Sequence, residues 1–164
     1  LDQAFVADHT LDTLGQPGLV KTTRTAGLDL NKPRLRAVLH AVIALAPLPT
    51  GFTASQLADQ VRHLMGWTDS QYRPRQAAYD LKKLRGKQWV EKIGNSRRYQ
   101  PLPVGLKIMA ALLTLREKVV KPVLAGSTKP KSEPIPPNQS ELDIQYRKEQ
   151  TEMHQLLLML GIAV

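Results

Sequence analysis

One short β-hairpin is predicted in a chain whose other apolar residues recur mostly at helical spacing. The Gly-Asn-Ser sequence at 94–96 favours a tight turn, and residues 89–93 and 97–100 on either side are typical of strands. Elsewhere apolar residues lie three and four positions apart, which indicates helices with one buried face. The sequence therefore predicts a mainly α fold with a small β-hairpin.

A first helix is expected over 33–46. Asn31 can cap its start, and Pro33 suits the first helical turn. The expected buried face consists of Leu35, Val38, Leu39, Val42, Ile43 and Ala46.

A second helix carries the clearest start signals in the chain. Thr53 and Gln56 form a capping box, and Phe52 and Leu57 form a hydrophobic staple around it. Gly66 is expected to end the helix. The expected buried stripe consists of Leu57, Val61, Leu64 and Met65.

A third helix is expected over 74–85, because Pro74 fits the first helical position. We expect Gly86 to end it in the left-handed conformation. Its buried face consists of Ala77, Leu81 and Leu84. Its opposite face carries Arg75, Tyr79, Lys82 and Lys83.

The flanking segments are less strongly patterned. Residues 1–30, punctuated by glycine, are expected to form a loosely packed arm with a short helix at 2–8. Residues 104–120 return to helical spacing. The expected buried positions of that helix are Leu106, Met109, Ala110, Leu113 and Val120.

The end of the chain is expected to hold one more helix. Residues 125–140 are rich in Pro, Ser, Lys and Gly, a composition typical of a flexible linker. The predicted organisation is therefore an arm at 1–30, a domain at 31–124, a linker at 125–140 and a C-terminal helix at 141–164.

Positive charge is concentrated in one part of the chain. The formal net charge is +9, and residues 73–98 hold nine basic residues against two acidic ones. A solvated surface is the plainer explanation, but charge of this local density favours a polyanionic partner. Because 42% of the 164 residues are hydrophobic, the chain can also build a compact core.

The order of three helices, a hairpin and a further helix resembles a winged-helix DNA-binding domain. The resemblance covers residues 31–121 and rests on PRQAAYDLKKLRG at 74–86 and WVEKIGNSRRY at 89–99. It implies that the third helix enters the major groove of double-stranded DNA, while the hairpin, the wing, lies over the backbone or the adjacent minor groove. The major groove is wide enough for one α-helix, which agrees with this expectation.

Two groups of candidate DNA-contacting residues follow. Residues of types that pair with base edges lie near the start of the third helix: Arg75, Gln76 and Tyr79. Residues expected to contact phosphates lie on this helix and on the wing: Arg73, Lys82, Lys83, Arg85, Lys92, Asn95, Ser96, Arg97 and Arg98.

Asp80 is the acidic exception within the basic helix. It is expected to pair with Arg85, Lys83 or Arg73, or to accept a hydrogen bond from a cytosine amine.

Aromatic residues are expected to pack rather than to stack on bases. They make up only 5% of the chain, which argues against a single-strand binder that relies on base stacking. Trp67, Trp89 and Tyr99 are therefore predicted to lie in the core or to support the wing.

The sequence predicts no enzyme active site, no cofactor and no metal. There is no cysteine, no phosphate-binding loop and no nucleophile elbow. The histidines at 9, 40, 63 and 154 lack zinc-ligand spacing. No apolar run approaches the ~20 residues of a membrane span, and an intracellular location, cytoplasmic or nuclear, is expected.

The final helix has two interpretations, docking on the domain or pairing with a second copy of the chain. Its apolar residues follow a four–three spacing, interrupted at Glu149, that favours a homodimer through 141–160. The residues concerned are Leu142, Tyr146, Met153, Leu156 and Leu160.

A regulator that binds double-stranded DNA is the leading hypothesis for function. Because the chain begins with Leu1, the DNA-binding module of a larger enzyme such as a transposase or recombinase stays open. A winged helix that contacts a protein or RNA is the third hypothesis.

Overall fold

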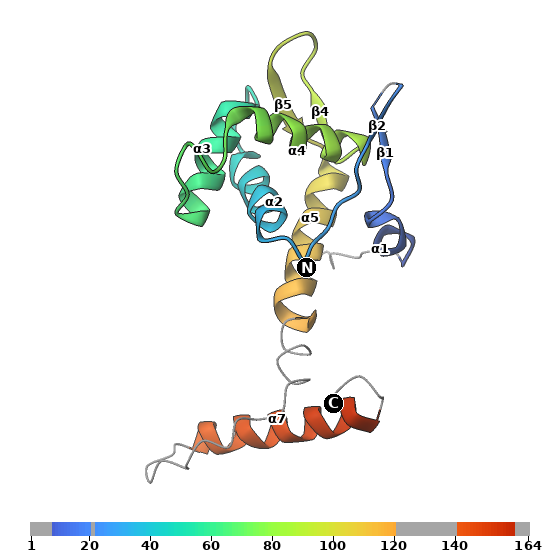
Figure 1. Cartoon of the computed structure of the whole chain (residues 1–164), viewed down its shortest axis with the longest axis vertical. Coiled ribbons are helices and arrows are strands. Elements are labelled where there is room, and N and C mark those ends of the chain that lie inside the picture. The colour runs from blue at the N-terminus through green and yellow to red at the C-terminus, as the bar shows by residue number, and fades with distance from the viewer. Residues whose placement is uncertain (1–7, 21, 121–140, 160–164) are drawn as a thin grey trace. The chain divides into compact units, whose positions relative to one another are not determined.

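The computed structural model describes residues 8–20, 22–120 and 141–159, whose helices and strands are shown in Figure 1. This part of the chain is mainly helical with two small antiparallel sheets, which confirms the expected mainly α class. None of its helices is both long and apolar enough to span a bilayer. The chain divides into two units, Leu1–Leu113 and Thr114–Val164, so this division falls before the expected boundary at 124.

Three helices form the core of the first unit. α2 spans Pro33–Leu45, α3 spans Ala54–Met65 and α4 spans Pro74–Gly86, and all three pack against one another. Their expected apolar faces supply much of the core, although Ile43, Ala46 and Met65 are only partly buried. Large side chains that are fully buried include Tyr72, Phe52, Leu39, Leu57, Leu81 and Leu84.

The start of α3 follows its sequence signals. The hydroxyl of Thr53 accepts from the backbone N–H of Gln56 at 3.2 Å, and the Gln56 side chain accepts from the Thr53 N–H at 2.9 Å. Gly66 ends the helix in the left-handed conformation with φ 64°. The prediction for Leu64 is wrong: this residue is 47% exposed, whereas Met65, the next residue along α3, packs against the core.

The start of α2 differs from the expectation. Lys32, not Asn31, is the N-cap residue, and its side chain makes no capping bond. The Asn31 backbone N–H instead donates to the Asp29 carboxylate at 3.0 Å, which forms a local turn before the helix. Pro33 at the first position leaves one fewer N–H to satisfy.

The expected hairpin is present and belongs to a three-stranded sheet. β4 spans Val90–Lys92 and β5 spans Arg98–Pro101, and the turn contains Gly94 with φ 52°. The short β3, Phe52–Thr53, was not foreseen and pairs with the other edge of β5. The strand order β3-β5-β4 therefore ties the hairpin to the start of α3.

The expectation of a loosely packed N-terminal arm is wrong for its described part. α1 spans Asp8–Leu14, and β1 (Gly18–Val20) and β2 (Thr23–Thr25) form an antiparallel hairpin that contacts α4. Leu14 and Leu28 are buried in the core. The helix expected at 2–8 falls largely on residues outside the described part.

Gly86 also differs from its expected role. It remains helical, and Gln88 is the residue that takes a positive φ, at 59°. A Cβ at Gly86 would lie 2.6 Å from the Thr25 hydroxyl oxygen. Gly86 therefore serves the close approach of the N-terminal hairpin to α4 rather than the end of the helix.

After the three-stranded sheet, α5 spans Pro103–Leu115 and a π-helical turn, η1, spans Arg116–Val120. Met109 and Leu113 are buried as expected, but Ala110 is exposed, because it lies about 100° around the helix from Met109. α7 spans Glu141–Met159, which confirms the final helix. Of the apolar residues expected to pair, Met153 and Leu156 are exposed. The described residues do not include the expected linker at 125–140, Leu160, or the side chains of Leu142 and Tyr146.

Candidate nucleic-acid interface

α4 separates a buried apolar face from an exposed polar one. Ala77, Leu81 and Leu84 are fully buried, as expected. On the other side Arg75 and Tyr79 are exposed. The periodicity of one amphipathic helix thus turns the side chains proposed to contact base edges outward.

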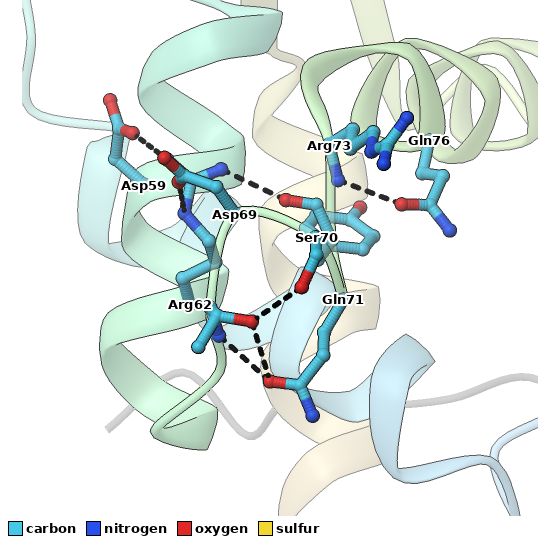
Figure 2. A network of polar contacts seen from close by, with 9 residues as sticks. Asp59, Arg62, Asp69, Ser70, Gln71, Arg73 and Gln76 are labelled. Atoms are coloured by element: carbon cyan, nitrogen blue, oxygen red, sulfur yellow. Dashed lines mark hydrogen bonds and ion pairs between the residues drawn. The ribbon is translucent and has the colours of Figure 1, made fainter.

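Gln76 is already engaged at the start of α4. The backbone N–H of Arg73 donates to the side-chain oxygen of Gln76 at 2.7 Å, and Figure 2 shows this bond beside the exposed Arg73 side chain. The bond satisfies a backbone N–H at the beginning of the helix. One of the two polar groups with which Gln76 would pair with adenine is therefore occupied within the protein.

The connection between α3 and α4 is fixed by Arg62. Its guanidinium donates to the Tyr72 carbonyl at 2.8 Å and pairs with Asp69 at 2.9 Å, and it also contacts Asp59. Figure 2 shows Asp59 on α3 and Asp69 in the connection that leads towards Arg73. Arg62 thereby positions the first residues of α4, a role that the sequence did not indicate.

Asp80 is buried, with only 1% of its surface exposed, and has three partners. Arg34 of α2 pairs with one carboxylate oxygen at 2.8 Å, and Lys83 lies 3.4 Å from the same oxygen. The Tyr72 hydroxyl donates to the other oxygen at 2.9 Å. Of the expected partners only Lys83 is confirmed, since the burial of Asp80 leaves no surface for a cytosine.

Arg34 and Tyr72, the two partners of Asp80 with raised pKa values, hold their protons tightly. Burial and the neighbouring charge of Asp80 raise the pKa of Tyr72 far above its ordinary value. Burial opposes the charge on Arg34, but the hydrogen bond and attraction from Asp80 outweigh it and raise the pKa of that guanidinium. The Asp80 side chain therefore lies inside the fold, paired with Arg34, and away from the exposed face of α4.

The other basic residues of α4 divide between packing and solvent. Lys83 is largely committed, since its ammonium pairs with Asp80 and lies 4.7 Å from the centre of the Tyr79 ring. Lys82 and Arg85 are half-buried and line a groove beside the helix.

In the β4–β5 hairpin some candidate residues bond within the protein and others are exposed to solvent. The hydroxyl of Ser96 donates to the Ile93 carbonyl at 2.6 Å and closes the turn. Arg98 donates to the Gly51 carbonyl at 3.0 Å, which holds the hairpin to the loop before α3. Lys92, Asn95 and Arg97 are exposed.

A groove runs between the β1–β2 hairpin, α4 and the β4–β5 hairpin, with a volume of about 760 Å³. Its cationic residues are Lys82, Arg85 and Lys92, and Glu91 is the one acid among the described residues that line it. The side chain of Gln100 donates to the Glu91 carboxylate at 2.6 Å. We call this feature the basic groove.

The expected packing of the aromatic residues is confirmed. Trp89 belongs to the core, and Trp67 and Tyr99 are partly buried against it. Base stacking therefore has little support from these side chains. Within the described residues no group of three or more histidines and carboxylates is placed to hold a metal ion.

No known protein family, curated protein or solved structure matches this chain. What the site can bind must therefore be inferred from its own residues. The exposed residues of the site are cationic or hydrogen-bonding, and its single buried acid, Asp80, pairs with Arg34 and Lys83.

Proposed function

We propose that this chain binds double-stranded DNA in the manner of a winged-helix domain, with α4 in the major groove and the β4–β5 hairpin over the neighbouring backbone. The observation that carries the proposal is the exposed face of α4, which presents Arg73, Arg75 and Tyr79 and continues into the basic groove. A cationic surface built from a helix and two hairpins suits a polyanion better than a small ligand.

The rigidity of the hairpin supports the proposal. β5 pairs with β4 on one side and with β3 on the other, and Arg98 bonds to the loop before α3. The hairpin therefore stands in a fixed position relative to the three helices. A fixed spacing between helix and hairpin is what contact with one duplex at two places requires.

The candidate contacts have different roles within the proposal. Arg75 is suited to bidentate bonds with guanine, each such pair being worth about 1–3 kcal/mol of base discrimination. Arg73, Lys82, Arg85, Lys92 and Arg97 supply phosphate contacts, which position the protein without reading sequence. Four candidates already bond within the protein, so only their remaining donors and acceptors are available to DNA. They are Gln76, Lys83, Ser96 and Arg98.

The first test is a fluorescence-anisotropy titration of duplex DNA at several salt concentrations. The wild-type chain is compared with the double variant Lys82→Ala/Arg97→Ala. The matched control removes two exposed charges that are not among the proposed contacts, Lys107→Ala/Lys148→Ala. Each lost phosphate contact lowers the slope of log affinity against log salt by about 0.9, so the first variant should flatten it by about 2 and the control should leave it unchanged.

Two results would overturn the proposal. One is the absence of duplex binding by the wild-type chain at low salt, and the other is equal behaviour of the two double variants. Duplex RNA and single-stranded DNA serve as competitors in the same assay. We expect both to bind more weakly than duplex DNA, because the major groove of RNA is too narrow for a helix and the site offers few stacking surfaces.

A further inference from the structure

The β1–β2 hairpin is fixed to the end of α4 by contacts between main chains. A Cβ at Gly18 would lie 2.6 Å from the Gly86 carbonyl oxygen, so glycine is needed for this approach. Thr25, on the opposite strand, is buried, and its hydroxyl donates to the Gly18 carbonyl at 3.1 Å. The hairpin is therefore part of the same rigid body as α4.

Lys87 adds a second attachment. Its ammonium donates to the Gln16 carbonyl at 2.8 Å and also contacts the Thr13 carbonyl. Burial lowers the pKa of this lysine. Lys87 therefore joins the end of α4 to the segment before β1. Its ammonium is bound to carbonyl groups of the protein rather than directed towards the groove.

The far end of this hairpin forms one wall of the basic groove. Val20, Thr22 and Thr23 line it from one side, and Lys92 and Asn95 line it from the other. In Figure 1 both hairpins extend past α4 in the same direction. Leu19 also lines the groove and is 67% exposed. This wall therefore presents a large apolar side chain that packing within the chain does not cover.

The β1–β2 hairpin, like the basic groove, has an excess of positive charge. Residues 13–28 contain Lys21 and Arg24 and no acidic residue. Arg24 is exposed and is not itself a lining residue, but it lies opposite Leu19 in the hairpin register, and Leu19 lines the groove. An open groove with cationic and hydroxyl-bearing walls suits an extended anion whose charge repeats along its length.

We infer that the β1–β2 hairpin is a second DNA-contacting arm, which together with the β4–β5 hairpin grips the sugar–phosphate backbone of duplex DNA in the basic groove. The inference rests on the proposed function and extends it to residues proposed to contact the backbone rather than base edges. Thr22, Thr23 and Asn95 donate hydrogen bonds to phosphate oxygens, while Arg24, Lys82 and Arg85 supply charge.

The test uses two substitutions on the hairpin and a matched control for each. Arg24→Ala removes an exposed charge and is compared with Lys107→Ala. Thr23→Glu places a carboxylate in the groove and is compared with Thr114→Glu, at an exposed position on α5. Thermal denaturation of all four variants checks that the fold is kept, which we expect because each position is exposed.

Arg24→Ala is expected to flatten the salt slope by about 1 and to weaken binding roughly fivefold to tenfold near physiological salt, equally for all duplex sequences. Thr23→Glu is expected to weaken binding at least as much, and neither control should change it. If both hairpin variants bind like their controls while Lys82→Ala/Arg97→Ala still loses affinity, this inference fails and the proposed function stands. If the wild-type chain binds no duplex, both fail.

Discussion

Arg34 in the first turn of α2 pairs with Asp80 in the middle of α4 at 2.8 Å, although 46 residues separate them in sequence. Arg34 keeps 36% of its side chain exposed, whereas Asp80 keeps 2%. The pair therefore joins a partly hydrated cation to a carboxylate that has no access to water. The two partners are not equivalent, because Asp80 depends on Arg34 more than Arg34 depends on Asp80.

Removal of Arg34 is expected to cost more stability than removal of both charges. Arg34→Ala leaves a buried carboxylate with only Lys83 and Tyr72, and should lower the free energy of unfolding by about 3 kcal/mol. Adding Asp80→Asn removes the buried charge that has lost its closest partner and should restore part of the loss. Urea denaturation of both single variants and the double variant measures the coupling. Additive effects would show that the pair contributes nothing as a pair.

Tyr72 should make the fold sensitive to alkaline pH. Its pKa in the folded protein is raised above the ordinary 10.0 by burial and by Asp80. Below pH 10 the phenol is protonated in both states and its contribution is fully present. Above pH 10 only the unfolded state loses the proton, so the free energy of unfolding should fall by up to about 1.4 kcal/mol per pH unit.

Comparison with Tyr72→Phe isolates this contribution from that of the lysines. The variant should be less stable near neutral pH, because it lacks the bond to Asp80, but its stability should fall less steeply above pH 10. While both proteins are folded, phenolate absorbance in an alkaline titration should be the same for the wild-type chain and Tyr72→Phe, because Tyr72 stays protonated. Parallel stability curves for the two proteins would contradict the assignment.

The contact between Gly18 and Gly86 predicts an asymmetry between two nearby glycines. Gly18→Ala should destabilise the fold by about 1–3 kcal/mol, since its Cβ would meet backbone atoms of Gly86 at 2.6–3.0 Å. Gly15→Ala is the control, because nothing lies within 4 Å of its Cβ. Thermal denaturation measures both. A Gly18→Ala variant as stable as Gly15→Ala would mean that the hairpin is not held against α4.

Arg75 and Arg97 should differ in how their loss affects DNA recognition. A preferred duplex is first selected from a random pool. The Arg75→Ala protein should then discriminate less well between this duplex and variants changed at one base pair, by about 1–3 kcal/mol. Arg97→Ala should weaken all sequences alike and flatten the salt dependence by about 1. Uniform weakening by Arg75→Ala would move this residue to the group of phosphate contacts.

Local signals in the sequence predict the central helices and the hairpin well. Thr53 and Gln56, Pro74 and Gly94 each act within a few residues, so their effects can be inferred without knowledge of the rest of the fold. Burial at helix ends is harder to predict, because it depends on what lies opposite. Leu64 has the periodicity of the buried stripe and is nevertheless exposed, while Met65 beside it packs against the core.

Long-range partners could not be predicted from local patterns. The N-terminal hairpin is held by glycines, by Thr25 and by a lysine bound to carbonyls, none of which forms an apolar periodicity. Arg34 likewise shows no sign in the sequence that its partner is Asp80. Among the candidate DNA contacts, the bonds of Gln76 and Arg98 within the protein became visible only when their neighbours were placed.

The three-way attachment of Arg62 has a consequence for the kinetics of recognition. Because this guanidinium joins α3 to the turn before Arg73, the start of α4 is ordered before any ligand arrives. Association then needs no folding step and loses little conformational entropy at this point. Loosening the turn with Arg62→Ala should slow productive docking and shorten the lifetime of the complex, although Arg62 itself need never touch DNA.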